Sequence, residues 1–224
     1  MAKWKKILIF TCIAALLIPT AAFARQTKEE PRSYTVACIG DSLTFGTGSD
    51  EPGTQSWPAV LARESGDLAL KTYNFGVYGS TVEMFTPWSY NDTACFAESL
   101  RCDADVYLIM LGSNDTSSPA PGWTFDDAYR KMLDCYTNLP QDPTVVVLLP
   151  PDLYFHNYLS FTNEEIVRIR DSEREIAEQY GLNVIDLSAI SGDMEQYCVD
   201  GGHYNSTGYA MFADYIYSEL CSIL

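Results

Sequence analysis

Residues 34–42, with the sequence YTVACIGDS, contain the stretch that decides the fold of this chain. The run from Tyr34 to Ile39 is apolar or β-branched, which is typical of a buried β-strand, and Gly40 ends it. Further runs of strand length follow at residues 70–75, 106–111, 144–149 and 184–185. Because the third and fourth of these five runs are apolar throughout, they predict strands that are covered on both faces of a sheet.

The segments between these runs have the period of amphipathic helices. The predicted helices cover residues 58–65, 125–139, 166–180 and the segment from about residue 206 onward. Thr124 and Asp127 resemble a capping box at the start of the second helix. Thr162 and Glu165 form another box before the third helix, and Gly181 is its expected stop.

Strands that alternate with such helices predict one α/β domain, with a sheet that is covered by helices on both faces. In sheets of this kind, binding sites form at the carboxyl ends of the strands. The predicted ends carry glycine and polar residues: GDS at 40–42, NFGVYG at 74–79 and GSND at 112–115. We therefore expect the functional site at this edge of the sheet.

The first 24 residues have the features of a secretory signal peptide. Lysines at positions 3, 5 and 6 precede an apolar run, and Ala22-Phe-Ala24 fits the cleavage rule of signal peptidase. A membrane anchor is the alternative, but the apolar run is short for a span of about 20 residues. We expect a signal peptide at 1–24, a polar linker at 25–33 and a single domain at 34–224. That domain would be secreted, periplasmic or held at the cell surface, without a stable membrane span after cleavage.

Charge and cysteine content narrow the partners and the chemistry. A formal net charge of −16 argues against nucleic acid, because phosphates would be repelled. Of the seven cysteines, Cys12 lies in the signal peptide, so six remain, and six cysteines allow 15 disulfide connectivities. We predict one pair, Cys95 with Cys102, and a buried free thiol at Cys38. The chain has no CxxC or HExxH motif, so we expect no zinc site.

Ser42 is the candidate nucleophile. A serine hydroxyl needs an adjacent base, usually histidine, and a third group that orients the base. The chain has two histidines. His203 directly precedes the last predicted helix, and Asp200 is close enough in the same turn to orient its imidazole. His156 lies in an aromatic stretch that equally suits a surface loop, so we prefer His203 as the base.

Acyl transfer also requires hydrogen-bond donors for the oxyanion, each typically worth about 3–4 kcal/mol. The backbone N–H groups of Ser42 and Gly79 and the side-chain amide of Asn114 are the candidates, since all three lie at predicted strand ends. Asp41 and Asp115 are expected to support these loops through hydrogen bonds to the backbone. Asn114 also begins a glycosylation sequence, Asn-Asp-Thr, but a glycan there would block the site.

Together these segments resemble the signature blocks of the SGNH, or GDSL, hydrolase family. The blocks occur in the family's order, with GDSL at 40–43, NFGVYG at 74–79, GSND at 112–115 and DGGH at 200–203. The resemblance implies a three-layer, flavodoxin-like sandwich with a mostly parallel sheet of about five strands, and no cofactor. It also implies that Ser42 attacks an ester, that His203 takes its proton and that Asp200 orients His203. The oxyanion hole would then consist of Ser42, Gly79 and Asn114.

Two features depart from the family's pattern. Tyr204 follows the histidine, where the family often has proline, and the Gly-Gly pair before His203 replaces a pattern with an apolar residue. Neither change removes a catalytic group, but both concern the geometry of the loop that holds the base.

The residues and the resemblance predict a secreted serine esterase that cleaves carboxylic O-esters through an acyl-enzyme on Ser42. A short acyl chain is favoured, such as an acetyl group on a carbohydrate. A lysophospholipase-like or thioesterase-like lipolytic enzyme is the first alternative, and a non-catalytic secreted binding module on the same fold is the second. Several aromatic residues near the motifs would either line the site or cover the edge of the core. They are Trp57, Phe85, Trp88, Tyr90 and Trp123.

Overall fold

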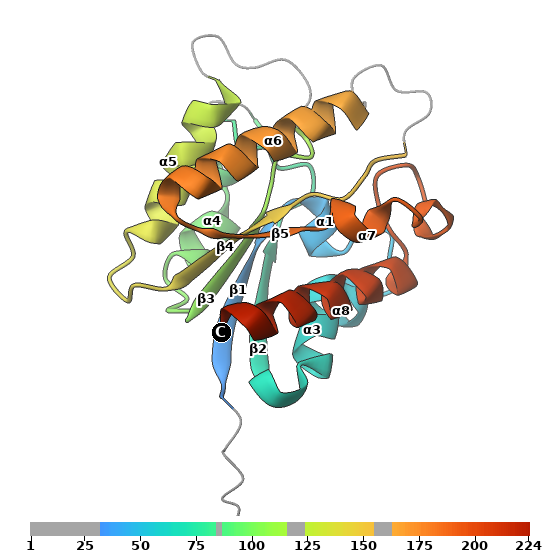
Figure 1. Ribbon diagram of the computed structural model, residues 1–224, viewed down its shortest axis with the longest axis horizontal. Helices are drawn as coiled ribbons and strands as arrows, with labels where there is room; N and C mark the ends of the chain where they lie inside the picture. The colour runs from blue at the N-terminus through green and yellow to red at the C-terminus, as the bar shows by residue number, and fades with distance from the viewer. Residues whose placement is uncertain (1–31, 84–86, 116–123, 155–162) are drawn as a thin grey trace, which may run out of the picture. The chain divides into compact units, whose positions relative to one another are not determined.

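A single sheet of five parallel strands, in the order β2-β1-β3-β4-β5, forms the centre of the domain (Figure 1). The strands are β1 (Tyr34–Gly40), β2 (Leu70–Gly76), β3 (Val106–Met110), β4 (Thr144–Leu149) and β5 (Asn183–Asp186). All predicted strands are therefore present. Gly40 pairs with Gly76 of β2 and with Met110 of β3, so the carboxyl ends of these three strands lie at one edge. The strand order reverses at β1, which is where sheets of this type form binding sites.

The computed structural model of the chain describes residues 32–83, 87–115, 124–154 and 163–224. The predicted signal peptide at 1–24 and nearly all of the predicted linker lie outside these residues, as do Phe85, Trp123, His156 and Thr162. In the described part of the chain, no helix has the length and apolar character needed to cross a membrane.

Helices cover both faces of the sheet and complete three layers (Figure 1). On one face lie α3 (Trp57–Glu64) and α8 (Ser206–Ile223), and on the other lie α4 (Ala94–Ser99), α5 (Phe125–Thr137) and α6 (Asn163–Tyr180). The connections contain α1 (Ser42–Phe45), α2 (Pro52–Gln55), α7 (Ser188–Ser191) and 3₁₀ turns at Gly66–Leu68, Tyr90–Asp92 and Glu195–Tyr197. This is the expected three-layer α/β sandwich.

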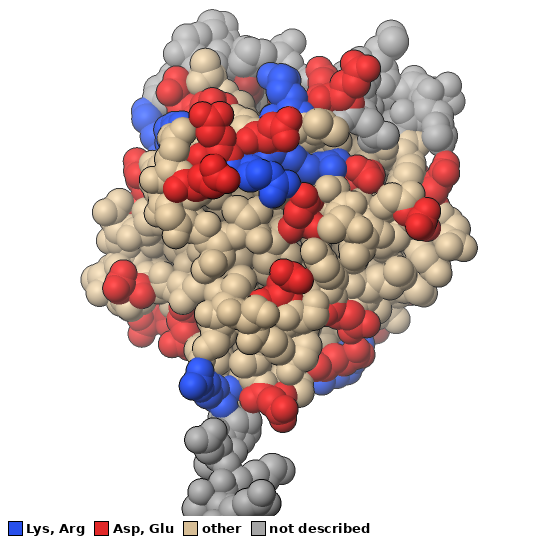
Figure 2. Space-filling view, viewed as in Figure 1, with Lys and Arg blue, Asp and Glu red and all other residues tan. Residues whose placement is uncertain are grey.

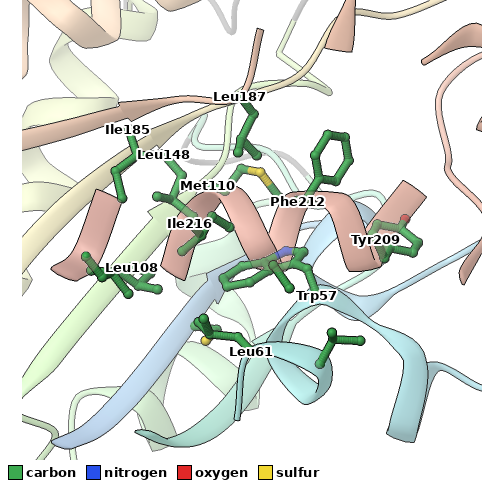
Figure 3. Packing of buried hydrophobic residues seen from close by; sticks show 14 of the residues in the cluster. Trp57, Leu61, Leu108, Met110, Leu148, Ile185, Leu187, Tyr209, Phe212 and Ile216 are labelled. Carbon is green, nitrogen blue, oxygen red and sulfur yellow. The ribbon is translucent and has the colours of Figure 1, made fainter. Parts of the chain in front are cut away.

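Alternate side chains of each strand enter two different hydrophobic cores. In β1, Val36 and Cys38 belong to the core under α3 and α8, whereas Ala37 and Ile39 belong to the opposite core. Figure 3 shows the first core, in which Trp57 and the apolar face of α8 pack against the strands. Burial of a large apolar side chain contributes about 1.5–3 kcal/mol to stability. Packing on both faces thus stabilises the sheet, and the loops at the carboxyl ends of its strands start from buried, well-packed residues.

The helix ends follow the predicted chemistry where the structure describes them. Thr124 Oγ1 accepts a hydrogen bond from the Asp127 N–H at 3.2 Å, as the first capping box predicts. Gly181 follows the last residue of α6 with a φ of +67°, the left-handed conformation that glycine adopts without strain. The structure adds a cap that was not predicted: the side chain of Asn205 caps α8 by accepting from the Gly208 N–H at 3.0 Å.

The predicted disulfide between Cys95 and Cys102 is wrong: both residues are free thiols in the structure, and Cys38 is a buried free thiol as expected. Cys95 lies in α4 and Cys102 follows that helix. At 1.5 Å of rise per residue, seven residues of helix and turn separate two Cα atoms by about 10 Å, beyond the reach of a disulfide. The sequence distance suggested an open loop, but helix formation holds the two thiols apart.

Candidate active site

Ser42 is placed by the tight turn that joins β1 to α1. The Asp41 carboxylate caps α1 by accepting from the Leu43 N–H at 2.8 Å, and Ser42 is the first helical residue. A methyl group on Gly40 would lie 2.0 Å from Thr44 Oγ1 and 2.6 Å from the Met110 carbonyl oxygen, so only glycine fits there. The turn leaves Ser42 just 5% exposed, at the edge of the sheet.

Ser42, His203 and Asp200 form a continuous chain of hydrogen bonds. His203 Nε2 lies 2.8 Å from Ser42 Oγ, although the two residues are 161 positions apart. His203 Nδ1 lies 2.7 Å from Asp200 Oδ2. A carboxylate can only accept at Nδ1, so it favours the tautomer with the proton on Nδ1, which leaves Nε2 free to accept the serine proton. The structure therefore brings together the three residues that the sequence proposed for proton transfer.

Asp200 and His203 lie on one hairpin, Tyr197–Asn205, whose two arms are joined by backbone hydrogen bonds. Its ladder consists of the Val199 N–H to the His203 carbonyl at 2.8 Å and the Asn205 N–H to the Tyr197 carbonyl at 2.8 Å. Inside the hairpin, Asp200 Oδ1 accepts from the N–H groups of Gly202 at 3.0 Å and of His203 at 2.8 Å. The two glycines that depart from the family's pattern therefore allow a tight turn that the carboxylate itself closes; Gly201 has a φ of +97°.

Partial burial raises the pKa of Asp200, but the hydrogen bonds from the His203 side chain and from the Gly202 and His203 N–H groups outweigh it. The net result is a pKa below the ordinary value of an aspartate. Asp200 is therefore ionised at neutral pH and can orient and stabilise a protonated imidazole.

Tyr204, where the family often has proline, attaches the hairpin to the hydrophobic core and to the segment after β4. Its ring is fully buried and packs edge-on against Phe212 of α8, with ring centroids 4.8 Å apart. Its hydroxyl donates to the Asp152 carbonyl at 2.7 Å. The Tyr154 N–H donates to the Gly201 carbonyl at 2.6 Å, so the segment after β4 holds the hairpin at a second point. Sequence reasoning noted Tyr204 only as a departure and missed this contact.

The three predicted oxyanion donors differ in whether they already donate hydrogen bonds within the protein. In the described part of the chain, the N–H groups of Ser42 and Gly79 have no hydrogen-bond acceptor, and Gly79 adopts a φ of +73°. Asn114 Nδ2, by contrast, donates to Asp41 Oδ2 at 3.2 Å and to the Ser80 carbonyl at 3.0 Å. To donate to an oxyanion, Asn114 must share or release one of these two hydrogen bonds.

Asp41 and Asp115 hold three loops together beside Ser42. Asp41 Oδ2 accepts from Ser113 Oγ at 2.5 Å, which joins the β1–α1 turn to the loop after β3. The two oxygens of Asp115 accept from the N–H groups of Val82 and Glu83, each at 3.0 Å, which joins that loop to the segment after Gly79. Both carboxylates thus contact the backbone of the loops, in the manner expected of supporting residues.

These supporting carboxylates belong to a buried acidic cluster that also contains Glu173 of α6. Desolvation raises the pKa of Asp41 to about 6, although bonds from Ser113 and Leu43 partly offset it. Desolvation likewise raises the pKa of Asp115 to about 7, against the bonds from Val82 and Glu83. Glu173 is fully buried, and its carboxyl oxygens have no hydrogen-bond partner among the described residues. Its pKa is raised by burial and then by Asp115 and Asp41.

Glu173 lies close to Gly112, at the start of the loop that carries Asn114. A methyl group on Gly112, whose φ is +113°, would lie 2.8 Å from Glu173 Oε1. The charge of Arg170 partly offsets the raised pKa of Glu173, but its guanidinium is also paired with Asp152 at 2.6 Å. Within the described residues, no group of three or more histidine, cysteine or acidic side chains is arranged to hold a metal ion.

A comparison with protein families identifies the chain. Residues 38–211 match the model of the GDSL-like lipase/acylhydrolase family. The chain belongs to this family. The match covers the first three sequence blocks and the Asp200–His203 pair, and it confirms the resemblance that those motifs predicted.

One curated protein is similar to this chain in sequence, and solved structures are similar to it in fold. An acetylxylan esterase of Xylanibacter ruminicola is 28% identical over 206 residues, which cover 81% of this chain and 42% of that protein. The chain thus spans about two fifths of the length of this curated relative. A carbohydrate acetylesterase of Sinorhizobium meliloti has a TM-score of 0.69 at 21% identity, with 86% of this chain and all of that chain covered. The aryl esterase of M. smegmatis has a TM-score of 0.66 at 19% identity, covering 85% and 99%.

The aromatic residues near the GDSL-family motifs divide into core and surface. Trp57 and Tyr90 are completely buried, so they belong to the hydrophobic cores. Trp88 is 61% exposed, and its ring lies 3.6 Å from the position of a methyl group on Gly79. Tyr78, which sequence reasoning did not single out, is 63% exposed and stacks on the His203 ring.

Proposed function

We propose that this GDSL-family chain is a serine esterase that hydrolyses short-chain carboxylic O-esters, with acetyl groups on carbohydrates as the substrate class. The observation that carries the proposal is the 2.8 Å separation of Ser42 Oγ and His203 Nε2, continued by the 2.7 Å contact between His203 Nδ1 and Asp200. This geometry suits proton transfer without any rearrangement of the three side chains.

In the proposed reaction, Ser42 Oγ attacks the ester carbonyl carbon while His203 Nε2 takes the hydroxyl proton. The resulting oxyanion accepts hydrogen bonds from the Ser42 and Gly79 N–H groups and from the Asn114 amide. When the tetrahedral intermediate collapses, the alcohol leaves with the proton from His203, and the acyl group remains on Ser42. Water then attacks the acyl-enzyme, gives its proton to His203 and releases the carboxylic acid. Ionised Asp200 stabilises the imidazolium in both halves.

Similar proteins, charge and the predicted export of the domain support a neutral, short-chain carbohydrate ester. An acetylxylan esterase is 28% identical to this chain, and a carbohydrate acetylesterase shares the fold. The net charge of −16 disfavours anionic substrates. Figure 2 shows acidic side chains spread over the visible face of the domain, with the larger basic group near α6. A polysaccharide substrate also agrees with export of the domain through the predicted signal peptide.

An acyl-length series tests the activity and the substrate class together. The domain should hydrolyse nitrophenyl acetate with a far higher kcat/KM than nitrophenyl palmitate, as measured by nitrophenolate release. A preference for the long chain would replace the proposal with a lipolytic enzyme. A fluorophosphonate probe should label the protein at Ser42, as peptide mass spectrometry detects. No labelling would instead point to a binding module on the same fold.

A further inference from the structure

Tyr78 is an exposed tyrosine that contacts the proposed base yet takes no part in the proton relay. Its ring stacks on the His203 imidazole, with centroids 5.9 Å apart and planes inclined by 24°. It remains 63% exposed, and it immediately precedes Gly79, a proposed oxyanion donor. A large ring left in water beside a buried serine needs a reason, since burial of such a surface is favourable.

The contact of Tyr78 with His203 places its ring near the expected position of the alcohol part of the ester. His203 must pass its proton to the oxygen of the departing alcohol, so that oxygen lies within hydrogen-bond reach of Nε2. Since the Tyr78 ring lies against the same imidazole, we expect the alcohol part of the ester to lie next to this ring. The acyl carbon, by contrast, is bonded to Ser42 Oγ, and its oxygen lies toward the Gly79 N–H.

Trp88 adds a second exposed ring beside the Gly79 turn. Its ring lies 3.6 Å from the position of a methyl group on Gly79. Its backbone is tied to the turn, because the Thr81 N–H donates to the Trp88 carbonyl and the Tyr90 N–H donates to the Thr81 carbonyl, each at 2.9 Å. Trp88 therefore has a fixed place next to the proposed oxyanion hole, with 61% of its surface exposed.

We propose that Tyr78 and Trp88 form a subsite for the sugar ring of the alcohol part of the ester, with Tyr78 as the main contact. The C–H face of a pyranose is flat and apolar, so it can cover an aromatic face while its hydroxyls stay in water. Tyr78 is thus a specificity-determining residue. This inference rests on the proposed carbohydrate esterase activity and names the surface that recognises the sugar.

The test compares a sugar ester with a ring-free ester on Tyr78→Ala. The substrates are methyl xyloside carrying one acetyl group and ethyl acetate, and acetate release is measured for both. If the ring binds sugar, kcat/KM for the sugar ester should fall about tenfold more than kcat/KM for ethyl acetate, and the excess loss should be in KM. Tyr78→Phe, which keeps the ring, should retain the preference for the sugar ester. Tyr73→Ala, which removes another exposed tyrosine stacked on Phe75, should leave both activities unchanged.

Other results would overturn the inference in distinguishable ways. If Tyr78→Ala lowers kcat equally for both substrates, the ring only positions His203 and the subsite does not exist. If the unaltered protein hydrolyses ethyl acetate but does not act on the sugar ester, the carbohydrate substrate class fails first. Trp88→Ala gives an independent reading, since the subsite predicts an excess loss on the sugar ester there also.

Discussion

The carboxylates on the two sides of Ser42 lie in opposite environments. Asp200, on the side of the base, is 51% exposed and receives three hydrogen bonds from its own hairpin, and its pKa lies below the ordinary value. Asp41, Asp115 and Glu173, on the oxyanion side, are buried, and desolvation raises their pKa values. The pKa of Asp200 is thus shifted toward the charged form, and the pKa values of the other three are shifted toward the protonated form.

This difference separates the requirements of catalysis from those of stability. A charged Asp200 stabilises the imidazolium, and its exposure means that this charge costs little desolvation. The buried cluster instead fixes the loops that carry the proposed oxyanion donors, and each ionisation within it brings like charges together in a poorly solvated place. We therefore expect acid to lower stability in this region mainly through protonation of Asp200. Alkali should lower stability mainly through ionisation of the buried cluster of Asp41, Asp115 and Glu173.

Removal of the nucleophile or the base should have the largest effect of any change in either region. We expect Ser42→Ala and His203→Ala each to lower kcat for nitrophenyl acetate by about 10⁴-fold or more, because the remaining residues cannot form an acyl-enzyme. Thermal unfolding should show that both variants remain folded. Retained turnover in Ser42→Ala would mean that another group attacks the ester.

Asn114→Ala tests the oxyanion side directly. Loss of one oxyanion donor should lower kcat by about 100- to 1,000-fold with a smaller change in KM. The substitution also removes the contacts to Asp41 and the Ser80 carbonyl, so thermal stability must be measured in parallel. Asn138→Ala, at the end of α5, is the matched control and should leave kcat unaltered. An unchanged kcat in Asn114→Ala would remove this residue from the oxyanion hole.

Glu173→Gln tests whether Glu173 is protonated in the folded protein. The folded pKa of Glu173 is raised, so its stabilising contribution is complete below the unfolded pKa and is lost as pH rises through the folded pKa. We expect Glu173→Gln to match the unaltered protein near pH 4. Its stability advantage should then grow by about 1.4 kcal/mol per pH unit until the folded carboxyl ionises.

Urea unfolding between about pH 4 and pH 8 measures this advantage. The control is Glu178→Gln, the same substitution at an exposed position of α6, which should show no such trend. A constant difference in unfolding free energy across the pH range would show that Glu173 is ionised in the folded protein.

Asp200→Asn should produce the smallest change in stability, and in the opposite pH range. Because the folded pKa of Asp200 is lowered, its contribution is present above the unfolded pKa and is lost as pH falls through the folded pKa. The variant should therefore lose part of the acid-induced fall in melting temperature below about pH 4, and only slightly, since the group is half exposed. Asp193→Asn is an exposed control nearby. An equal shift at neutral and acidic pH would contradict the lowered pKa.

The strands, the long helices and the Ser42–His203–Asp200 arrangement followed from local patterns. Apolar runs that end in glycine mark buried parallel strands, and a strand end fixes where Ser42 must lie. The Cys95–Cys102 pair failed because sequence spacing does not reveal that α4 separates the two thiols. The bonds of Asn114 to Asp41 and Ser80 also could not be predicted, because they depend on how three loops meet in space.

Glu173 did have a signal in the sequence. It stands four residues after Ile169 and three before Ile176, inside the apolar stripe of its helix. A glutamate at such a position must either escape to solvent or be buried with its proton. Tyr78 had no comparable signal, because its contact with His203 joins two turns that only the folded sheet edge brings together.

The hairpin Tyr197–Asn205 carries both the proposed base, His203, and the carboxylate that orients it, Asp200, on one short segment. The hydrogen bonds that align Asp200 with His203 lie within these nine residues, whereas the nucleophile, 161 positions away in the sequence, is placed by β1. A graft of this segment between family members would carry a pre-aligned acid–base unit. The recipient would have to match the contacts of Gly201 and Tyr204 with the segment after β4 and the close approach of Gly48 to the hairpin.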